Sequence, residues 1–263
     1  MIMILYPERA ERISKIMSGC SICSRREAER LISEGRITLN GCVVSEPGTK
    51  AVAGRDKICL DGAELDLKAG GGGGYGYYLL NKPCGYLTTC SDPFGRKTIF
   101  DLIELDGHYF PAGRLDLNSR GLVFITNDGL LCDLIIHPRN RIEKVYMVKI
   151  GRPLDQQEEK LLENGVEFEG ESYRALKVSA DKRYKNGDTV YKVVLNEGKK
   201  REIRYMFKAL GVAVKDLFRV RIANLSVEGV KEGSYRALTE GEIRELKEIT
   251  GYEKESEKSK RKS

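Results

Sequence analysis

The sequence predicts an α+β protein in two parts: a small N-terminal unit and a larger unit built on a mixed, mostly antiparallel sheet. With 263 residues, the chain is long enough for one small and one larger hydrophobic core. An uninterrupted glycine run at 70–74 is typical of a flexible linker. Beyond it, strand-like and helix-like segments follow without the strict alternation of a doubly wound fold. We therefore expect an N-terminal domain at 9–67, a glycine-rich linker at 68–75, a main domain at 76–250 and a disordered basic tail at 251–263.

The N-terminal unit is expected to combine two short helices with hairpin-forming strands. A first helix is predicted from Arg12 to Met17. A second begins after Ser24, which stands three residues before Glu27 as in a capping box. Asn40-Gly41 is a strong signal for a two-residue hairpin turn. The strands expected around this turn and at the end of the unit are 36–39, 42–44 and 58–62, the last with its own turn.

The larger unit is expected to be rich in strands. Runs of β-branched and aromatic residues bounded by turn residues predict strands at 77–81, 122–126, 144–150, 173–179, 189–195 and 222–227. Apolar residues at helical spacing predict helices at 98–105, 130–136, 155–165, 201–210 and 240–249. The final residues, 253–263, have no apolar side chain and end in Lys260-Arg261-Lys262, so we expect them to be disordered.

Composition limits the partners and the compartment. Lys and Arg total 45 against 39 for Asp and Glu, so the net charge of +6 does not by itself indicate a nucleic-acid partner. The seven cysteines are scattered and odd in number, the first residues lack a basic leader, and no apolar run approaches the ~20 residues that span a bilayer. We therefore expect a cytoplasmic protein with reduced thiols and no membrane association. Cys20-Ser21-Ile22-Cys23 lacks a second ligand pair, so no metal site is predicted.

The most informative stretch is 113–129, which begins Gly-Arg-Leu-Asp. It places the carboxylate of Asp116 on a polar turn beside Arg114 and ahead of an apolar strand. The glycines Gly113 and Gly121 permit left-handed backbone angles or close approaches of the chain. An acid held at the end of a rigid strand among cations suits a carboxylate nucleophile. On spacing alone, the alternative stays open that Asp116 merely accepts hydrogen bonds from turn amides.

Three segments resemble, in family order, the motifs of RNA pseudouridine synthases that modify ribosomal RNA. The Gly113-Arg114-Leu115-Asp116 segment resembles the motif that carries their catalytic aspartate. The Asn81-Lys82-Pro83-Cys84-Gly85 segment resembles their N-K-P-x-G motif, and 197–207 is similar to E-G-x-x-R-x-I-R-x-M-F. Residues 12–62 are similar to the small RNA-binding domain called S4, which this branch carries at its N-terminus. The resemblance spans most of the chain and implies a mixed sheet with a central cleft.

This resemblance implies isomerisation of uridine to pseudouridine, which needs no cofactor; the sequence shows no Walker loop or dinucleotide fingerprint. It implies that Asp116 is the catalytic carboxylate. It also implies that Arg204 keeps that acid charged, as a guanidinium fork can hold a carboxylate bidentately in a pocket that would otherwise neutralise it. Lys144-Val145-Tyr146 resembles the family's K-x-Y segment, which implies that Tyr146 stacks on uracil or serves a proton transfer. Leu225 resembles the apolar residue that packs on the other side of the base.

RNA contacts are expected from basic and aromatic side chains in both units. In the larger unit, the expected substrate-binding residues are Arg114, Lys82, Leu225, Lys199 and Arg201. In the S4-like domain, the expected RNA-binding residues are Arg25, Arg26, Arg30 and Arg36. Tyr86 and Phe94 offer stacking surfaces, and Arg96 and Lys97 add positive charge. A uridine in folded RNA must leave its stack to reach Asp116.

The function expected from these observations is site-specific modification of ribosomal RNA, either free or in an assembly intermediate, by a monomer. The segment Asp92-Pro93-Phe94-Gly95-Arg96-Lys97 looks more like the enzymes of the 23S large-subunit RNA than the 16S enzyme. One alternative is a non-catalytic RNA-binding or ribosome-assembly factor with the same fold. Another is a glycoside hydrolase, but that chemistry usually needs a pair of acids, and the matched motifs offer Asp116 no evident partner.

Overall fold

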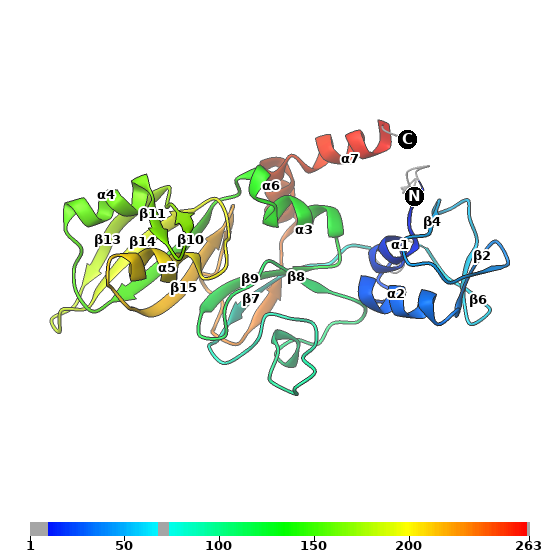
Figure 1. Cartoon of the computed structure of the whole chain (residues 1–263), viewed down its shortest axis with the longest axis horizontal. Helices are drawn as coiled ribbons and strands as arrows, with labels where there is room; N and C mark the ends of the chain where they lie inside the picture. The colour runs from blue at the N-terminus through cyan, green and yellow to red at the C-terminus, as the bar shows by residue number, and fades with distance from the viewer. Residues whose placement is uncertain (1–9, 68–73, 262–263) are drawn as a thin grey trace.

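The structure is a computed structural model that describes residues 10–67 and 74–261 (Figure 1). Most of the predicted glycine-rich linker, 68–73, therefore lies outside the described residues, as does residue 9. The chain forms a small N-terminal unit and a larger unit built on one extended sheet, as predicted.

The N-terminal unit has its own hydrophobic core beneath two short helices. Helices α1 (Ile13–Gly19) and α2 (Arg25–Ser33) bury apolar side chains against the strands. The predicted helix cap is confirmed, since the Ser24 hydroxyl accepts the backbone N–H of Glu27 at 3.1 Å. The predicted hairpin is confirmed by the pairing of Leu39 with Cys42 across Asn40-Gly41. The strands are β1 (Glu11–Arg12) paired with β4 (Lys50–Ala51), and a sheet in the order β3 (Cys42–Val44), β2 (Ile37–Leu39), β5 (Ile58–Leu60) and β6 (Ala63–Glu64).

The larger unit is organised by a mixed, mostly antiparallel sheet. Its main path runs β13 (Lys177–Arg183), β14 (Thr189–Leu195), β10 (Lys144–Ile150), β15 (Val214–Ile222), β9 (Arg120–Thr126), β7 (Tyr77–Lys82) and β17 (Tyr235–Ala237). Only the β9–β15 pair on this path is parallel, and it is short: Arg120 and Gly121 pair with Phe218 and Arg219. At the margins, β8 (Phe110–Ala112) pairs with β9, β16 (Leu225–Ser226) pairs with β15, and β11 (Val166–Phe168) forms a hairpin with β12 (Glu171–Tyr173).

Helices cover the two faces of this sheet over different strands (Figure 1). The alternation of side chains in β9 separates the faces: Val123 and Ile125 join one hydrophobic cluster, whereas Leu122 and Phe124 join the other. The first cluster includes residues of α4 (Gln156–Asn164) and α5 (Glu202–Ala209), and the second includes residues of α3 (Gly129–Ile136) and α6 (Glu240–Thr250). The strands at 144–150 and 189–195 and the helices α3 to α6 confirm the sequence predictions within a residue or two.

Three predicted elements of the larger unit are wrong in their extent. The helix expected at 98–105 is only a short 3-10 turn, η2 (Ile99–Asp101). The strand expected at 173–179 is interrupted and divides between β12 and β13. The strand expected at 222–227 instead begins earlier as β15 and turns back at Ala223, whose φ is +49°. The sequence pattern did not predict the first part of β15 because this part carries several charged residues. The strand lies within the sheet, paired on both edges, but one of its faces is partly exposed and accommodates these side chains.

The prediction that the C-terminal segment is disordered is wrong for residues 252–261, which form helix α7 (Tyr252–Arg261). Its first residue, Tyr252, lies near the buried carboxylate of Asp128, and burial together with that negative charge raises the pKa of the tyrosine. The ammonium group of Lys247 lies over its ring, 4.7 Å from the centroid. A tyrosine anchored at the first turn, followed by good helix formers without glycine or proline, explains why this polar segment continues as a helix. Residues 262–263 lie outside the described chain.

Gly121 makes the short parallel contact between β9 and β15 possible. Its φ is +108°, and a Cβ at this position would lie 2.3 Å from the Arg219 carbonyl oxygen. We expect Gly121→Ala to destabilise the fold by roughly 3 kcal/mol or more, because backbone strain and a steric clash add. Urea unfolding followed by circular dichroism measures this loss. The control is Gly129→Ala at the start of α3, where nothing lies within 4 Å of the added Cβ. Similar unfolding midpoints for both variants would contradict the assignment.

Candidate active site

Asp116 stands on a short loop, residues 115–119, which we call the aspartate loop. It lies in the connection between β8 and β9, and its conformation is set by hydrogen bonds to its backbone. The Thr88 hydroxyl donates to the Leu115 carbonyl at 2.9 Å and accepts the Leu115 N–H at 3.2 Å. The Ser119 N–H donates to the Asp116 carbonyl at 3.0 Å. The backbone of the loop is therefore held on both sides of the carboxylate-bearing residue.

The largest correction to the expected site concerns Lys82, which was predicted to contact the substrate. Its side chain is fully buried beneath the aspartate loop. The ammonium group donates to the carbonyls of Ser119 at 2.7 Å, Pro83 at 3.0 Å and Asp116 at 3.3 Å. Burial lowers the pKa of Lys82 to about 8. Lys82 therefore ties the end of β7 to the aspartate loop and has no surface left for RNA.

Arg204 lies beside Asp116, as the sequence predicts, but the predicted bidentate fork is wrong. Its Nε is 3.9 Å from Asp116 Oδ2, an ion pair without a hydrogen bond. The guanidinium nitrogens instead donate to the Asn118 carbonyl at 2.9 Å, the Ser119 hydroxyl at 3.2 Å and the Val214 carbonyl at 3.4 Å. The Asp116 side chain is 37% exposed, so the acid is also less buried than expected. The guanidinium is thus oriented by the loop and leaves the carboxylate oxygens accessible.

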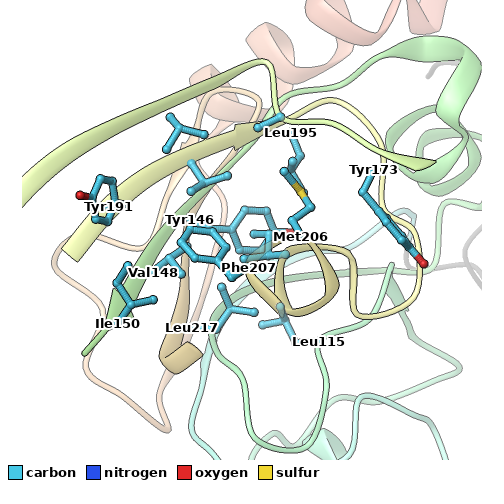
Figure 2. Packing of buried hydrophobic residues seen from close by; sticks show 14 of the residues in the cluster. Leu115, Tyr146, Val148, Ile150, Tyr173, Tyr191, Leu195, Met206, Phe207 and Leu217 are labelled. Atoms are coloured by element: carbon cyan, nitrogen blue, oxygen red, sulfur yellow. The ribbon is translucent and has the colours of Figure 1, made fainter. Parts of the chain in front are cut away.

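Tyr146 comes from the centre of β10 and packs on the same side of the sheet as the aspartate loop. It is buried in the cluster that contains Leu115, the residue before Asp116, together with Met206 and Phe207 of α5 (Figure 2). Leu225, by contrast, is fully buried in the cluster on the opposite face. The expectation that Leu225 packs on the substrate base is therefore corrected: the turn at Ala223 directs it into the core.

Other basic residues near the site differ in how free they are. Arg114 is exposed and Arg201 is exposed at the N-terminus of α5. Lys199 is engaged: its ammonium group donates to the Ser172 carbonyl at 2.6 Å and lies 5.4 Å from the centre of the Tyr173 ring. Arg114 and Arg201 are therefore more available than Lys199 to contact an incoming phosphate.

The four arginines expected to bind RNA in the N-terminal unit divide into two pairs. Arg30 forms ion pairs with Glu27 and Glu34, and Arg36 forms one with Asp61 at the surface. Arg25 and Arg26 are exposed, and no ion pair joins either to another residue in the described part of the chain. Exposed ion pairs contribute little to stability, so all four guanidiniums can reach phosphate, with Arg25 and Arg26 the least hindered.

Sequence reasoning missed a group of buried polar side chains beneath Tyr146. Arg219, the strand partner of Tyr146, is almost fully buried and donates to the Leu122 carbonyl at 2.8 Å, where β9 and β15 diverge. Burial, with the positive charge of Arg219, lowers the pKa of Lys144 to about 8. Burial raises the pKa of Glu202, which accepts the Lys199 N–H at 2.9 Å. For Lys144, its place at the start of the apolar run 144–150 was an available signal, whereas Arg219 and Glu202 lie among other charged residues and offered none.

Two further observations concern metal binding and membrane-spanning helices. In the described ranges, no three His, Cys, Asp or Glu side chains gather as a possible metal site. None of the helices in the part of the chain that the structure covers is long and apolar enough to cross a membrane.

Comparison with known proteins agrees with this geometry. The sequence profile described as RNA pseudouridylate synthase matches residues 76–209, and the profile of the S4 domain matches residues 11–55. The chain is 36% identical over 242 residues to an uncharacterized RNA pseudouridine synthase of Aquifex aeolicus, covering 91% of this chain and 95% of the relative. It is 34% identical over 248 residues to ribosomal large subunit pseudouridine synthase B of Bacillus subtilis, covering 93% and 98%.

A solved structure extends the comparison to the fold. The crystal structure of a pseudouridylate synthase superimposes with a TM-score of 0.62 and 27% identity, covering 89% of this chain and 99% of that one. Fold and site thus define an RNA-modifying enzyme with a separate RNA-binding domain. The chain belongs to the RNA pseudouridine synthase family, in the branch with an N-terminal S4 domain.

The position of Lys82 predicts that it supports the aspartate loop without contacting RNA. We expect Lys82→Met to lower turnover on an RNA substrate by roughly 100-fold, because a displaced carboxylate loses its alignment with the ribose. RNA affinity should stay within about twofold, as no phosphate contact is lost. Single-turnover rates and filter binding separate the two quantities. Lys160→Met on the exposed surface of α4 is the control. A parallel loss of affinity would instead restore Lys82 as a substrate contact.

Proposed function

We propose that this protein converts uridine to pseudouridine at a specific position of ribosomal RNA, with the 23S RNA of the large subunit as its substrate. The observation that carries the catalytic part is the pairing of Asp116 with Arg204 at 3.9 Å on a loop that Lys82 holds from below. A preorganised carboxylate beside a fixed guanidinium stays ready for reaction without rearranging the loop.

The reaction fits residues that act on charge and position alone. The N1–C1′ glycosidic bond breaks, the uracil rotates, and a new C5–C1′ bond forms while the C5 proton is lost and N1 regains one. Asp116 acts as an ionised carboxylate in one of two ways. It attacks C1′ as N1 leaves and is itself displaced when C5 bonds to C1′, or it removes a ribose proton and returns it when C5 bonds to C1′. Arg204 supports that charge, and Tyr146, in the cluster beside Leu115, stacks on the base or relays the proton lost from C5, its hydroxyl giving up its own proton as it takes that one. No electron is transferred in these steps, so a redox cofactor has no role in them.

Three features support ribosomal RNA as the substrate. The S4 domain places Arg25 and Arg26 on an exposed helix face. The larger unit adds the exposed cations Arg114 and Arg201 near the aspartate loop. One of the similar proteins is named for the large ribosomal subunit, and this chain covers 98% of it. We propose that the target uridine is everted from its stack into the site, which is least costly in a loop or a strained helix. A cytoplasmic location and a monomeric state belong to the same proposal.

Mapping of pseudouridines in ribosomal RNA tests the proposal directly. We expect cells without this protein, and cells with only Asp116→Asn, to lack the same single pseudouridine, because an amide can neither attack carbon nor accept a proton. Asp181→Asn, at an exposed position of β13, should restore it. If the Asp116→Asn map matched that of the parent, the protein would instead be a non-catalytic RNA-binding or assembly factor.

Arg204→Lys tests the role of the guanidinium. Lysine keeps the positive charge but cannot bond the Asn118 and Ser119 oxygens together while facing Asp116. We therefore expect turnover to fall by roughly 100-fold and RNA affinity to change far less. Single-turnover kinetics and filter binding measure both, with the exposed Arg244→Lys of α6 as the control. Equal losses of turnover and affinity would show that Arg204 binds RNA and does not serve the carboxylate.

A further inference from the structure

The chain between β7 and β8 forms a long excursion that is hydrogen-bonded to the aspartate loop. This excursion leaves the sheet and hangs below these strands in Figure 1. Its base is bonded to the aspartate loop, since the Gly85 N–H donates to the Leu117 carbonyl at 2.9 Å and Thr88 bonds Leu115 on both sides. The excursion then closes on itself where Leu87 pairs with Thr98. Residues 92–96, at its tip, are thus carried on a stem that is attached directly beside Asp116.

The tip is rigid because one carboxylate organises it. Asp92 accepts the backbone N–H groups of Phe94 at 3.1 Å and Arg96 at 3.0 Å. It also accepts the Arg96 guanidinium at 3.1 Å through Nε and at 2.6 Å through Nη2. The bonds from Arg96 hold the pKa of Asp92 down at about 2, so the carboxylate stays charged at physiological pH. Both neighbours are therefore fixed in place before any ligand arrives.

The tip carries an aromatic ring, that of Phe94, which is exposed to solvent. Phe94 is 81% exposed, the highest value among the exposed large hydrophobic residues in the described chain. The Arg96 guanidinium lies 5.4 Å from the centre of its ring, and the Lys97 ammonium lies 5.7 Å from the ring of Tyr86. A single exposed apolar residue is ordinary, but two rings each joined to a cation match the chemistry of an unpaired nucleotide, which offers a base to stack on and a phosphate.

We propose that Phe94 and Arg96 form a stacking platform for an unpaired base of the RNA beside the uridine that enters the site. The base lies against the open face of the Phe94 ring, Lys97 contacts a flanking phosphate, and Arg96 stays paired with Asp92 and holds the ring's surroundings in place. This proposal rests on the proposed function for its substrate, and it assigns the recognition of a neighbouring nucleotide to residues outside the catalytic group. RNA is favoured over a protein partner because the exposed ring lies beside the Arg96 guanidinium, and a second ring nearby, that of Tyr86, lies beside the Lys97 ammonium.

A fluorescent probe tests the platform: a 12-nucleotide single-stranded RNA of uridines that contains one 2-aminopurine. The fluorescence of 2-aminopurine is quenched when this base stacks on an aromatic ring. We expect the full-length protein to quench the probe, and Phe94→Ala to weaken its binding by about 5- to 100-fold. Phe94→Trp should bind at least as tightly as the parent. Phe94→Leu, which keeps apolar surface without a π face, should behave like Phe94→Ala. Ile249→Ala removes an exposed apolar side chain of α6 and should bind like the parent.

The outcomes distinguish this platform from the proposed function. Unchanged affinity and quenching in Phe94→Ala would overturn the platform, and parent-like binding by Phe94→Leu would show an apolar contact in place of stacking and would overturn it too. Asp116→Asn should still quench the probe, and adding Phe94→Ala to it should remove that quenching, since the change at 116 leaves the ring in place. If the parent formed no pseudouridine in ribosomal RNA but still quenched the probe through Phe94, the catalytic proposal would fail while the platform stood.

Discussion

The site depends on an ammonium group placed where no solvent can reach it. Lys82 is the last residue of β7, and its ammonium group donates hydrogen bonds to the carbonyls of Pro83, Asp116 and Ser119. Burying a cation without hydrogen-bond partners costs free energy, so the buried ammonium group favours the conformation in which all three carbonyls point at it. That conformation fixes the shape of the aspartate loop. The cost of burying the charge is visible in the lowered pKa of Lys82. Catalytic geometry is thereby built into the core of the sheet and not left to the loop itself.

Arg204 extends the same constraint to the other side of the loop. By bonding the Asn118 carbonyl and the Ser119 hydroxyl, it holds the loop and faces Asp116 at the same time. Because its nitrogens are already bonded, the guanidinium acts on the carboxylate through its charge at 3.9 Å and leaves both carboxylate oxygens free to react. An arrangement in which Arg204 grips the acid bidentately would have occupied the atoms that the reaction needs.

The contacts that we propose with RNA are spread over both units of the chain. The S4 domain has its own core, the larger unit offers cations beside the aspartate loop, and residues 92–96 form the hydrogen-bonded tip of the excursion between β7 and β8. Several weak contacts on one RNA raise the effective concentration of each of the others. Affinity therefore need not come from the catalytic residues, which explains why we expect changes at Lys82 or Arg204 to act on turnover.

The sequence by itself determined the family, the order of the main elements and the residues that meet at the site, because motifs and local periodicity are properties of neighbouring residues. It identified Asp116, Arg204 and the hairpin at Asn40-Gly41 for that reason. Only the tertiary structure decided which way side chains point. Lys82 and Leu225 read as substrate contacts in the sequence, yet both are buried, since their burial depends on strands and loops distant in the chain. Long-range packing is a sum over such contacts, and no local pattern contains it.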